Sequence, residues 1–175
     1  MAHGRLEFTM PASEAVAFDA FHFHQWRAQW DSLVGSSRVV DRAPCPYVGA
    51  LTENVGRGWL RGLAMRTRFV SFDRPHLAAA TMIGRSFPFE TWAASMRHLP
   101  NGSDASLLVY TYTFTTWPMS LRWLMDPLVD MIFARQTRRR FARMRKFLTH
   151  HASALEHWQR HAPSQEPRSS RVTTE

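Results

Sequence analysis

Cysteine is nearly absent from this sequence, which has one such residue, Cys45, among 175. A single thiol cannot form an internal disulfide, and it offers only one thiolate to a metal ion. Proteins of oxidising compartments commonly carry paired cysteines, whereas cytosolic proteins keep their thiols reduced. The composition therefore favours a reducing compartment, and we expect a cytoplasmic location.

Long hydrophobic runs are also missing. The most apolar stretch, residues 117–134, is interrupted by Arg122, Asp126 and Asp130, and charged side chains are costly at the centre of a bilayer. Residues 1–10 are polar and lack the apolar core of a secretory leader. We therefore expect no segment that crosses a membrane and no cleaved leader.

Recognisable catalytic and metal-binding motifs are the third absence. No Gly-x-Ser-x-Gly elbow occurs, and Cys45 lies between two prolines with no neighbour that would activate its thiol. Among nine histidines, His157 and His161 have a spacing that suits chelation on a helix, but the nearby sequence supplies no third ligand. We expect no metal site and no cofactor, and we assign no catalytic residue.

What the sequence does have is bulky apolar side chains and positive charge. Hydrophobic residues make up 45% of the chain, aromatic residues 13%, and the formal net charge is +8. This is enough apolar material for one domain with a sizeable core, which we expect to span residues 1–161. Residues 162–175 contain no large apolar side chain except Val172, so we expect a disordered tail.

Turn residues and hydrophobic spacing predict the order of elements. A short strand at residues 5–9 is followed by Ser13, a good helix N-cap, and then by two short helices. After Gly35 the pattern changes to strands separated by turns, and the Asn101-Gly102 pair predicts a tight hairpin. Six further strands are expected at residues 37–42, 50–55, 59–72, 77–83, 89–99 and 106–116.

A long helix is predicted to follow the last strand. Asp126 can serve as its N-cap, and Pro127 suits its first position, where a missing N–H has no cost. Residues 128–134 are apolar on nearly every side, so these first turns are expected to be the most buried. Further along, Phe141 and Leu148 belong to a single apolar stripe.

Three groups of residues carry a resemblance to a known family. They are Met10-Pro11-Ala12-Ser13-Glu14-Ala15-Val16 with Trp26 and Trp30 after it, Phe69-Val70-Ser71-Phe72-Asp73-Arg74-Pro75, and the Asp126-Pro127 helix that ends near Arg145-Lys146-Phe147-Leu148. In this order they resemble the helix-grip fold of the SRPBCC superfamily, which includes START lipid-transfer domains and bacterial polyketide cyclases. The resemblance implies an α+β fold with a curved antiparallel sheet of six or seven strands, two short helices and one long C-terminal helix. It also implies a tunnel between the sheet and that helix.

Alternation along the strands and spacing along the helices select candidates for the lining of such a tunnel. One face of the expected strand 106–116 is rich in aromatic residues, and Trp92 and Met96 share a face of the strand before it. A lining of this kind suits a flat or aliphatic ligand, although the same side chains could simply fill a core. The expected ligand-binding residues are Trp26, Trp30, Arg68, Glu90, Trp92, Met96, Tyr110, Tyr112, Phe114, Trp123, Met131 and Phe133.

The resemblance implies binding or transport of a hydrophobic small molecule, such as a lipid, a quinone or a polyketide-like compound. The alternative is an enzyme similar to polyketide cyclases and aromatases, in which Glu90, Tyr110 or Arg68 transfers protons. Burial among aromatic residues would raise the pKa of Glu90 toward a useful range, although a solvent-facing glutamate is the plainer interpretation. Arg68 could pair with a ligand carboxylate, with Glu90, or with surface acids.

The expected final helix carries a dense basic run. Its default role is a solvated outer face. The alternative is contact with an anionic membrane, to which each surface cation contributes on the order of 1 kcal/mol. Docking on nucleic acid is the weaker version of this alternative, because no recognised motif accompanies the run, and no nucleic-acid partner is expected. The membrane-facing candidates are Arg135, Arg138, Arg139, Arg143 and Lys146.

Overall fold

The computed structural model describes residues 1–31, 34–56 and 64–161. The tail expected at 162–175 and the first residues of the strand expected at 59–72 lie outside this part of the chain. The observed order is a strand, two short helices, six strands and a long helix, which confirms the expected α+β architecture. The elements are β1 (Ala2–Met10), α1 (Glu14–His22), α2 (His24–Trp30), β2 (Val34–Val39), β3 (Leu51–Gly56), β4 (Ala64–Asp73), β5 (Leu77–Met82), β6 (Phe89–Pro100), β7 (Ser106–Thr116), the 3-10 turn η2 (Met119–Leu121) and α3 (Arg122–His161).

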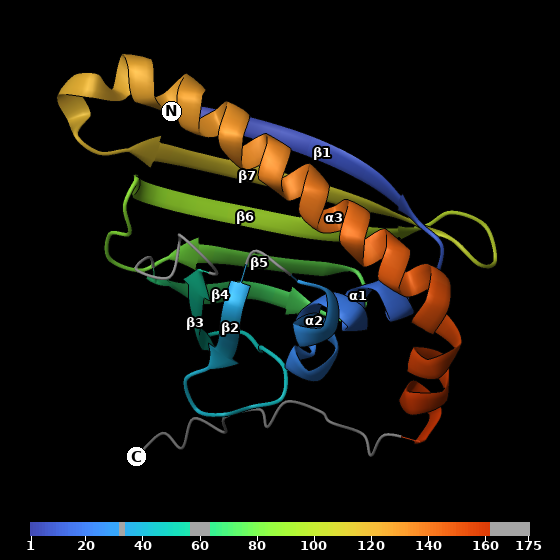
Figure 1. Ribbon diagram of the computed structural model, residues 1–175. Helices are drawn as coiled ribbons and strands as arrows, with labels where there is room; N and C mark the ends of the chain where they lie inside the picture. Colours follow the sequence, from blue (N-terminus) through green and yellow to red (C-terminus); the bar gives the residue numbers. More distant parts are fainter. Residues whose placement is uncertain (32–33, 57–63, 162–175) are drawn as a thin grey trace.

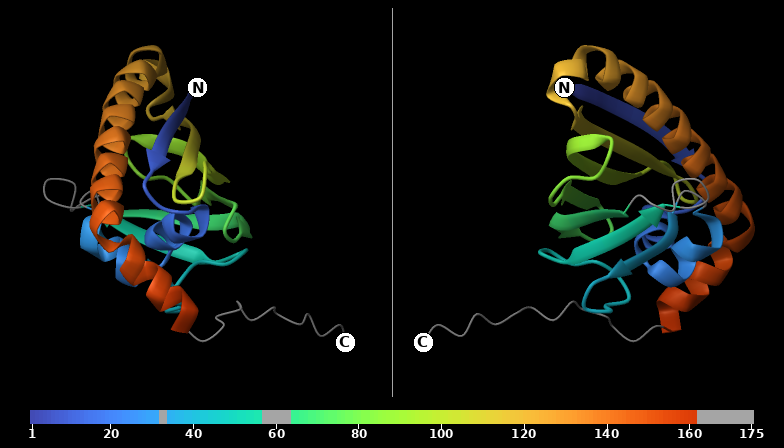
Figure 2. Two further views of the ribbon diagram at one scale, coloured as in Figure 1. Left: turned by 90° about the vertical axis from the view of Figure 1, so that its right-hand side faces the viewer. Right: turned by 60° about the vertical axis from the view of Figure 1, so that its left-hand side comes forward.

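The seven strands form one antiparallel sheet in the order β1-β7-β6-β5-β4-β3-β2. From β2 to β7 each strand pairs with the next along the chain, whereas β1 pairs with the last strand, β7. Helix α3 runs across β1 and β7, and α1 and α2 lie beside its C-terminal half (Figure 1). The turned views show how strongly the sheet curves beneath the helices (Figure 2). All three helices therefore cover one face of a curved sheet.

The two short helices form as the sequence predicts. Ser13 caps α1, because its hydroxyl oxygen accepts a hydrogen bond from the Val16 amide at 3.4 Å. Every residue from Val16 to His22 is buried, so α1 lies within the protein rather than on it. The indole N–H of Trp30 donates to the carbonyl oxygen of Ala20 at 3.0 Å, which fixes the end of α2 against α1.

The β6–β7 hairpin is confirmed, but its tight turn is not. Strand β6 ends at Pro100 and β7 begins at Ser106, and the amide of Asn101 donates to the carbonyl oxygen of Ala105 at 3.0 Å. Gly102 has φ +90°, which suits glycine. The prediction failed because Gly102 alone adopts the left-handed conformation that a two-residue turn of this type requires at both central positions.

The predicted start of the long helix is wrong. Helix α3 begins at Arg122, so Pro127 lies inside its first turns and Asp126 is not an N-cap. The Asp126 carboxylate instead accepts hydrogen bonds from the amide and hydroxyl of Thr116 at 2.9 and 2.7 Å and pairs with the N-terminal amine at 2.9 Å. These tertiary partners outweigh the local N-cap preference. Pro127 has no N–H to donate to the carbonyl of Trp123, four residues earlier in the helix.

The first turns of α3 are also far less buried than predicted. Only one side of this part of the helix faces the sheet, through residues such as Val129, so the apolar residues on its other sides remain in solvent. None of the helices in the described ranges is both long enough and apolar enough for a membrane span. The exposed apolar side chains of this region are Leu121, Trp123, Leu124, Leu128, Met131 and Ile132.

The core lies where α3 meets β1 and β7. Phe141, Met144 and Leu148 are fully buried along the predicted apolar stripe of α3, and they face Leu108 of β7 in the same cluster. The rings of Phe8 on β1 and Phe141 lie 4.8 Å apart. Helix α3 therefore packs directly on this side of the sheet through large apolar side chains.

Candidate functional site

A cavity of about 430 Å³ lies between the other half of the sheet and the helices. Cavities that hold small molecules fall in this range of volume. Strands β3, β4, β5 and β6 form one wall, and residues of α1, α2 and α3 form the other. The lining is largely apolar and includes Met65, Phe69, Phe89, Trp92, Met96, Val129, Ile132 and Phe133.

Small side chains on the sheet keep this space open. Ala78 and Ala80 on β5 and Ala94 on β6 all border the cavity, and Ala80 and Ala94 are partners across the two strands. Alternate residues of a strand point to opposite faces, so a bulky residue at any of these positions would enter the cavity. Thr52 and Thr67 belong to the same wall, and a hydrogen bond of 2.7 Å joins their hydroxyl groups.

Four of the residues predicted from the sequence border the cavity, namely Trp92, Met96, Tyr110 and Phe133. The aromatic ring of Phe89, which was not predicted, also borders it. A β-bulge between Phe89 and Thr91 explains this difference, because it breaks the alternation along β6 and turns Phe89 toward the cavity.

Four other predicted residues belong to packed regions instead. Tyr112 and Phe114 are 2% and 0% exposed and fill the space between β7 and α3, where the Tyr112 hydroxyl donates to Asp130 at 2.7 Å. Trp30 is buried at the junction of α1 and α2, and Trp26 packs against Trp158 with ring centroids 5.8 Å apart. These four residues therefore pack within the protein, as the alternative interpretation of a filled core predicts.

Three predicted residues point into solvent. Trp123 and Met131 are 77% and 62% exposed, because they lie on sides of α3 that do not face the sheet. Arg68 is exposed on the outer face of β4, since its neighbours Thr67 and Phe69 take the inner face. Their assignment to the cavity lining is wrong.

Glu90 does not border the cavity either. Its Oε1 atom lies 3.0 Å from Nε of Arg85, and its side chain is 21% exposed. Its Oε2 atom is buried and has no hydrogen-bond partner in the described part of the chain. The carboxylate is thus held in an ion pair at the β-bulge, away from the volume where a ligand would lie.

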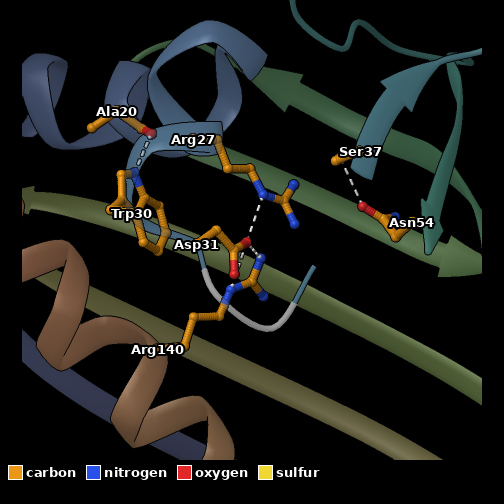
Figure 3. A network of polar contacts seen from close by, with 7 residues as sticks. All are labelled: Ala20, Arg27, Trp30, Asp31, Ser37, Asn54 and Arg140. Carbon is orange, nitrogen blue, oxygen red and sulfur yellow. Dashed lines mark hydrogen bonds and ion pairs between the residues drawn. The ribbon is translucent and has the colours of Figure 1, made fainter. Parts of the chain in front are cut away.

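A buried ion cluster closes the cavity where α2 meets α3. Oδ2 of Asp31 accepts from Nε of Arg27 at 2.9 Å and from Nε and Nη2 of Arg140 at 3.1 and 2.5 Å, as Figure 3 shows. The side chains of Arg27 and Arg140 are 13% and 14% exposed, and both border the cavity. Burial would raise the pKa of Asp31, but the two guanidinium groups outweigh it and lower that pKa to about 2. Burial lowers the pKa of Arg27 to about 10, helped by the charge of Arg140.

Sequence reasoning missed this cluster. Arg140 belongs to the basic run of α3, and the sequence of that run does not show that its side chain points inward while those of its neighbours point outward. The available signal was the spacing of Arg27 and Asp31, which are four apart and therefore adjacent on a helical turn.

Three histidines near the cavity lack hydrogen-bond partners within the described residues: His22, His24 and His98. Desolvation by burial lowers the pKa of His22 well below its usual range, that of His24 to about 4 and that of His98 to about 3. All three are therefore neutral at pH 7. His22 and His24 border the cavity, whereas His98 lies behind them against Phe18.

Other chemistry at the site is limited in the described part of the chain. Burial raises the pKa of Tyr110 to about 12, so its hydroxyl is a hydrogen-bond donor rather than a base at pH 7. No group of three or more histidine, cysteine, aspartate or glutamate side chains is placed there to hold a metal ion. The arrangement is suited to enclosing an apolar molecule and donating hydrogen bonds at one end.

Comparison with solved structures identifies the architecture. A START superfamily protein from Mycobacterium smegmatis superposes with a TM-score of 0.61 at 14% identity, over 89% of this chain and 97% of that one. The chain has the helix-grip fold. Other helix-grip structures include a norcoclaurine synthase from Thalictrum flavum, with a TM-score of 0.61 at 13% identity over 86% of this chain and 95% of that one. The di-domain aromatase/cyclase BexL matches with a TM-score of 0.66 at 8% identity, over 85% of this chain and 47% of BexL. No family model and no curated protein matches the sequence.

Proposed function

We propose that this protein binds and carries a hydrophobic small molecule, such as a lipid, a quinone or a polyketide-like compound, in the cavity between the sheet and α3. The observation that carries the proposal is the unfilled space of about 430 Å³ with a largely apolar lining. An apolar surface that its own side chains do not cover gains free energy when an apolar molecule covers it. The single cysteine suits a reducing compartment, and we place this activity in the cytoplasm.

A polyketide cyclase or aromatase activity is the rival function, and the likeness to BexL supports it. The positions of its expected proton donors count against it. Glu90 is paired with Arg85 away from the cavity, and Arg68 is on the outer face of the sheet. Tyr110 alone of these three borders the cavity. Turnover of a poly-β-ketone surrogate that is lost in Tyr110→Phe would favour the enzyme over the carrier.

The carrier proposal is tested by filling the cavity from the sheet. Ala94→Phe places a ring into the cavity, whereas Ala93→Phe places the same ring on the opposite face of β6 and is the matched control. Each variant is purified from the protein's own host and analysed by native mass spectrometry for a bound apolar compound. We expect a compound on the wild type and on Ala93→Phe, and none on Ala94→Phe. Equal occupancy of all three, or empty spectra from all three, contradicts the proposal.

Docking on an anionic membrane is a second candidate function, favoured by the exposed apolar residues at the start of α3. These residues continue to the edge of the cavity, which is bordered by Ile132 and by Phe87. Both side chains are also exposed, at 46% and 60%. Trp117 joins them through its amide, which donates to the carbonyl of Pro88 at 3.0 Å. Exposed tryptophans are typical of membrane interfaces.

The charge on the same helix selects a bilayer as the partner. The exposed face of α3 passes from these apolar residues to arginines such as Arg135 and Arg139. The chain has a net charge of +8, which opposes contact with a second copy and favours anionic lipid. Exposed apolar side chains can enter the interface of a bilayer while neighbouring arginines contact the anionic headgroups. A carrier docked there would meet its ligand at the edge of its cavity.

Vesicle co-sedimentation tests the docking. We expect binding to vesicles of phosphatidylcholine with phosphatidylserine, weaker binding to phosphatidylcholine alone, and release as salt rises. The double variant Trp123→Gln, Met131→Gln should lose most of this binding. Val70→Gln, on the exposed outer face of β4, is the control and should retain it. Binding that salt does not weaken, or that the double variant retains, rules the surface out.

A further inference from the structure

The cavity has two chemically different ends. Around the first turns of α3 its lining is apolar, with Phe89, Ile132 and Phe133. Arg140 lies eight residues after Ile132, roughly 12 Å further along α3, and marks the other end. The residues that border this second end are Arg27, His22, His24, Tyr110 and Arg140.

The second end carries positive charge that nothing in the cavity lining balances. Among the described residues that border the cavity, Arg27 and Arg140 are the charged side chains, and no carboxylate is among them. Asp31, which lies behind the two arginines, contributes one negative charge to two positive ones. The cluster of these three side chains therefore has a net charge of +1.

The arginines also have hydrogen-bond donors to spare. Within the described residues Arg27 donates through Nε alone, and in Figure 3 its terminal nitrogens point away from Asp31. Arg140 uses Nε and Nη2, which leaves Nη1. No acceptor for the Tyr110 hydroxyl occurs in the described ranges, although this group borders the cavity. Donors that face the cavity without an acceptor from the protein gain a partner when a ligand supplies one, so a ligand that accepts from them is favoured.

The two guanidinium groups are held in place before any ligand arrives. Their central carbons lie 4.7 Å (Arg27) and 4.8 Å (Arg140) from the ring centroid of Phe21, and both groups share the Asp31 carboxylate. A planar guanidinium matches a carboxylate through two parallel hydrogen bonds, and a fixed one loses little entropy on binding. His22, which is 3% exposed and has no hydrogen-bond partner in the described ranges, lies beside them at the same end.

We propose that the cavity takes an amphiphile with a single carboxylate, whose apolar body lies between the sheet and α3 and whose carboxylate accepts hydrogen bonds from Arg27 and Arg140. This inference rests on the proposed function and narrows its ligand class to apolar acids. One carboxylate neutralises the net charge of the cluster, and its two oxygens suit the unused guanidinium nitrogens and the Tyr110 hydroxyl. The alternative is a purely structural role, in which the arginines only join α2 to α3 through Asp31.

Matched pairs of probes separate these interpretations. Dodecanoate is compared with dodecanol, and naphthalene-1-acetate with naphthalene-1-acetamide, by isothermal titration calorimetry at pH 7.5 and low salt. Within each pair the apolar body is the same and only the charge of the head differs. Charge-assisted hydrogen bonds are roughly twice as strong as neutral ones. We therefore expect at least one acid to bind at least about ten times more tightly than its neutral partner.

Variants then locate the effect. Arg140→Gln should reduce the preference for the acid to about twofold and leave the affinity for the neutral partner unchanged. Arg139→Gln removes the same charge from the adjacent, exposed position of α3 and should keep the full preference. Arg27→Lys retains the charge and loses the planar fork, so the preference should fall severalfold even if Arg140→Gln proves too unstable to purify.

The outcomes are distinguishable from those of the proposed function. Equal affinity for acid and neutral probe in the wild type overturns the inference and leaves the apolar carrier intact. A preference that Arg139→Gln loses as fully as Arg140→Gln also overturns it, because the effect would then be one of overall charge. Failure of all four probes to bind counts against the proposed function itself.

Discussion

Acidification should destabilise this protein through its buried histidines, and His98 allows the size of the effect to be worked out. Its ring is fully buried, has no hydrogen-bond partner among the described residues, and burial lowers its pKa from 6.5 to about 3. Below pH 6.5 the unfolded chain therefore binds a proton at this position that the folded chain does not. Stability must fall as the pH falls, by about 1.4 kcal/mol per pH unit, so His98 should remove about 2 kcal/mol between pH 7 and pH 5.

Urea unfolding at pH 7, 6 and 5 measures this effect in His98→Leu against the wild type. Leucine removes the titrating group and both unpaired ring nitrogens, so the variant should lose about 2 kcal/mol less than the wild type between pH 7 and pH 5. His150→Leu, at an exposed position of α3, is the control and should follow the wild-type dependence. His22, whose pKa is lowered by burial and further by His98, acts in the same direction and remains in all three proteins; His98→Leu also weakens this contribution, which adds to the expected difference. Parallel pH dependences in His98→Leu and the wild type would refute the reasoning.

Two further substitutions test the packing and the ion cluster. Gly4→Ala would place a Cβ atom 2.3 to 2.6 Å from the side chain of Tyr112, so the ring must move and strain its hydrogen bond to Asp130. We expect urea unfolding to show a loss of about 1–3 kcal/mol in the free energy of unfolding. The loss should be smaller if Tyr112→Phe is already present. Asp31→Asn would leave two buried guanidinium groups without their counter-charge, and thermal unfolding should show a loss of about 3–5 kcal/mol in stability at pH 7. This loss should shrink at low pH, as the pH approaches the Asp31 pKa of about 2 and the wild type loses the same charge. An unchanged melting temperature at pH 7 would contradict the role given to this carboxylate.

The order of elements could be predicted from the sequence because it depends on local signals. Ser13 caps α1 through a bond to a residue three positions away, and Tyr110, Tyr112 and Phe114 alternate along β7 as strand residues do. Such signals need no knowledge of the rest of the chain. The prediction of where α3 starts is wrong for the opposite reason, because it depends on distant partners. Asp126 binds Thr116 and the N-terminal amine rather than capping the helix.

The site was harder to predict, because the strand pattern identifies a face but not the part of that face that stays open. Tyr112 and Trp92 both point toward the helices, yet α3 covers Tyr112 and leaves the cavity beside Trp92. The path of α3 over β1 and β7 decides this, and no residue of β6 or β7 encodes that path alone. Arg140 was missed because a tertiary partner, Asp31, draws it inward from a run of exposed arginines.

A crystal structure of the protein purified from its own host is the most direct test of the hollow between sheet and helix. The account predicts continuous electron density for one apolar molecule against Trp92, Ala80 and Ala94, with its polar end toward Arg27 and Arg140. A lining that has closed on itself, or a space that holds only ordered water, would contradict it.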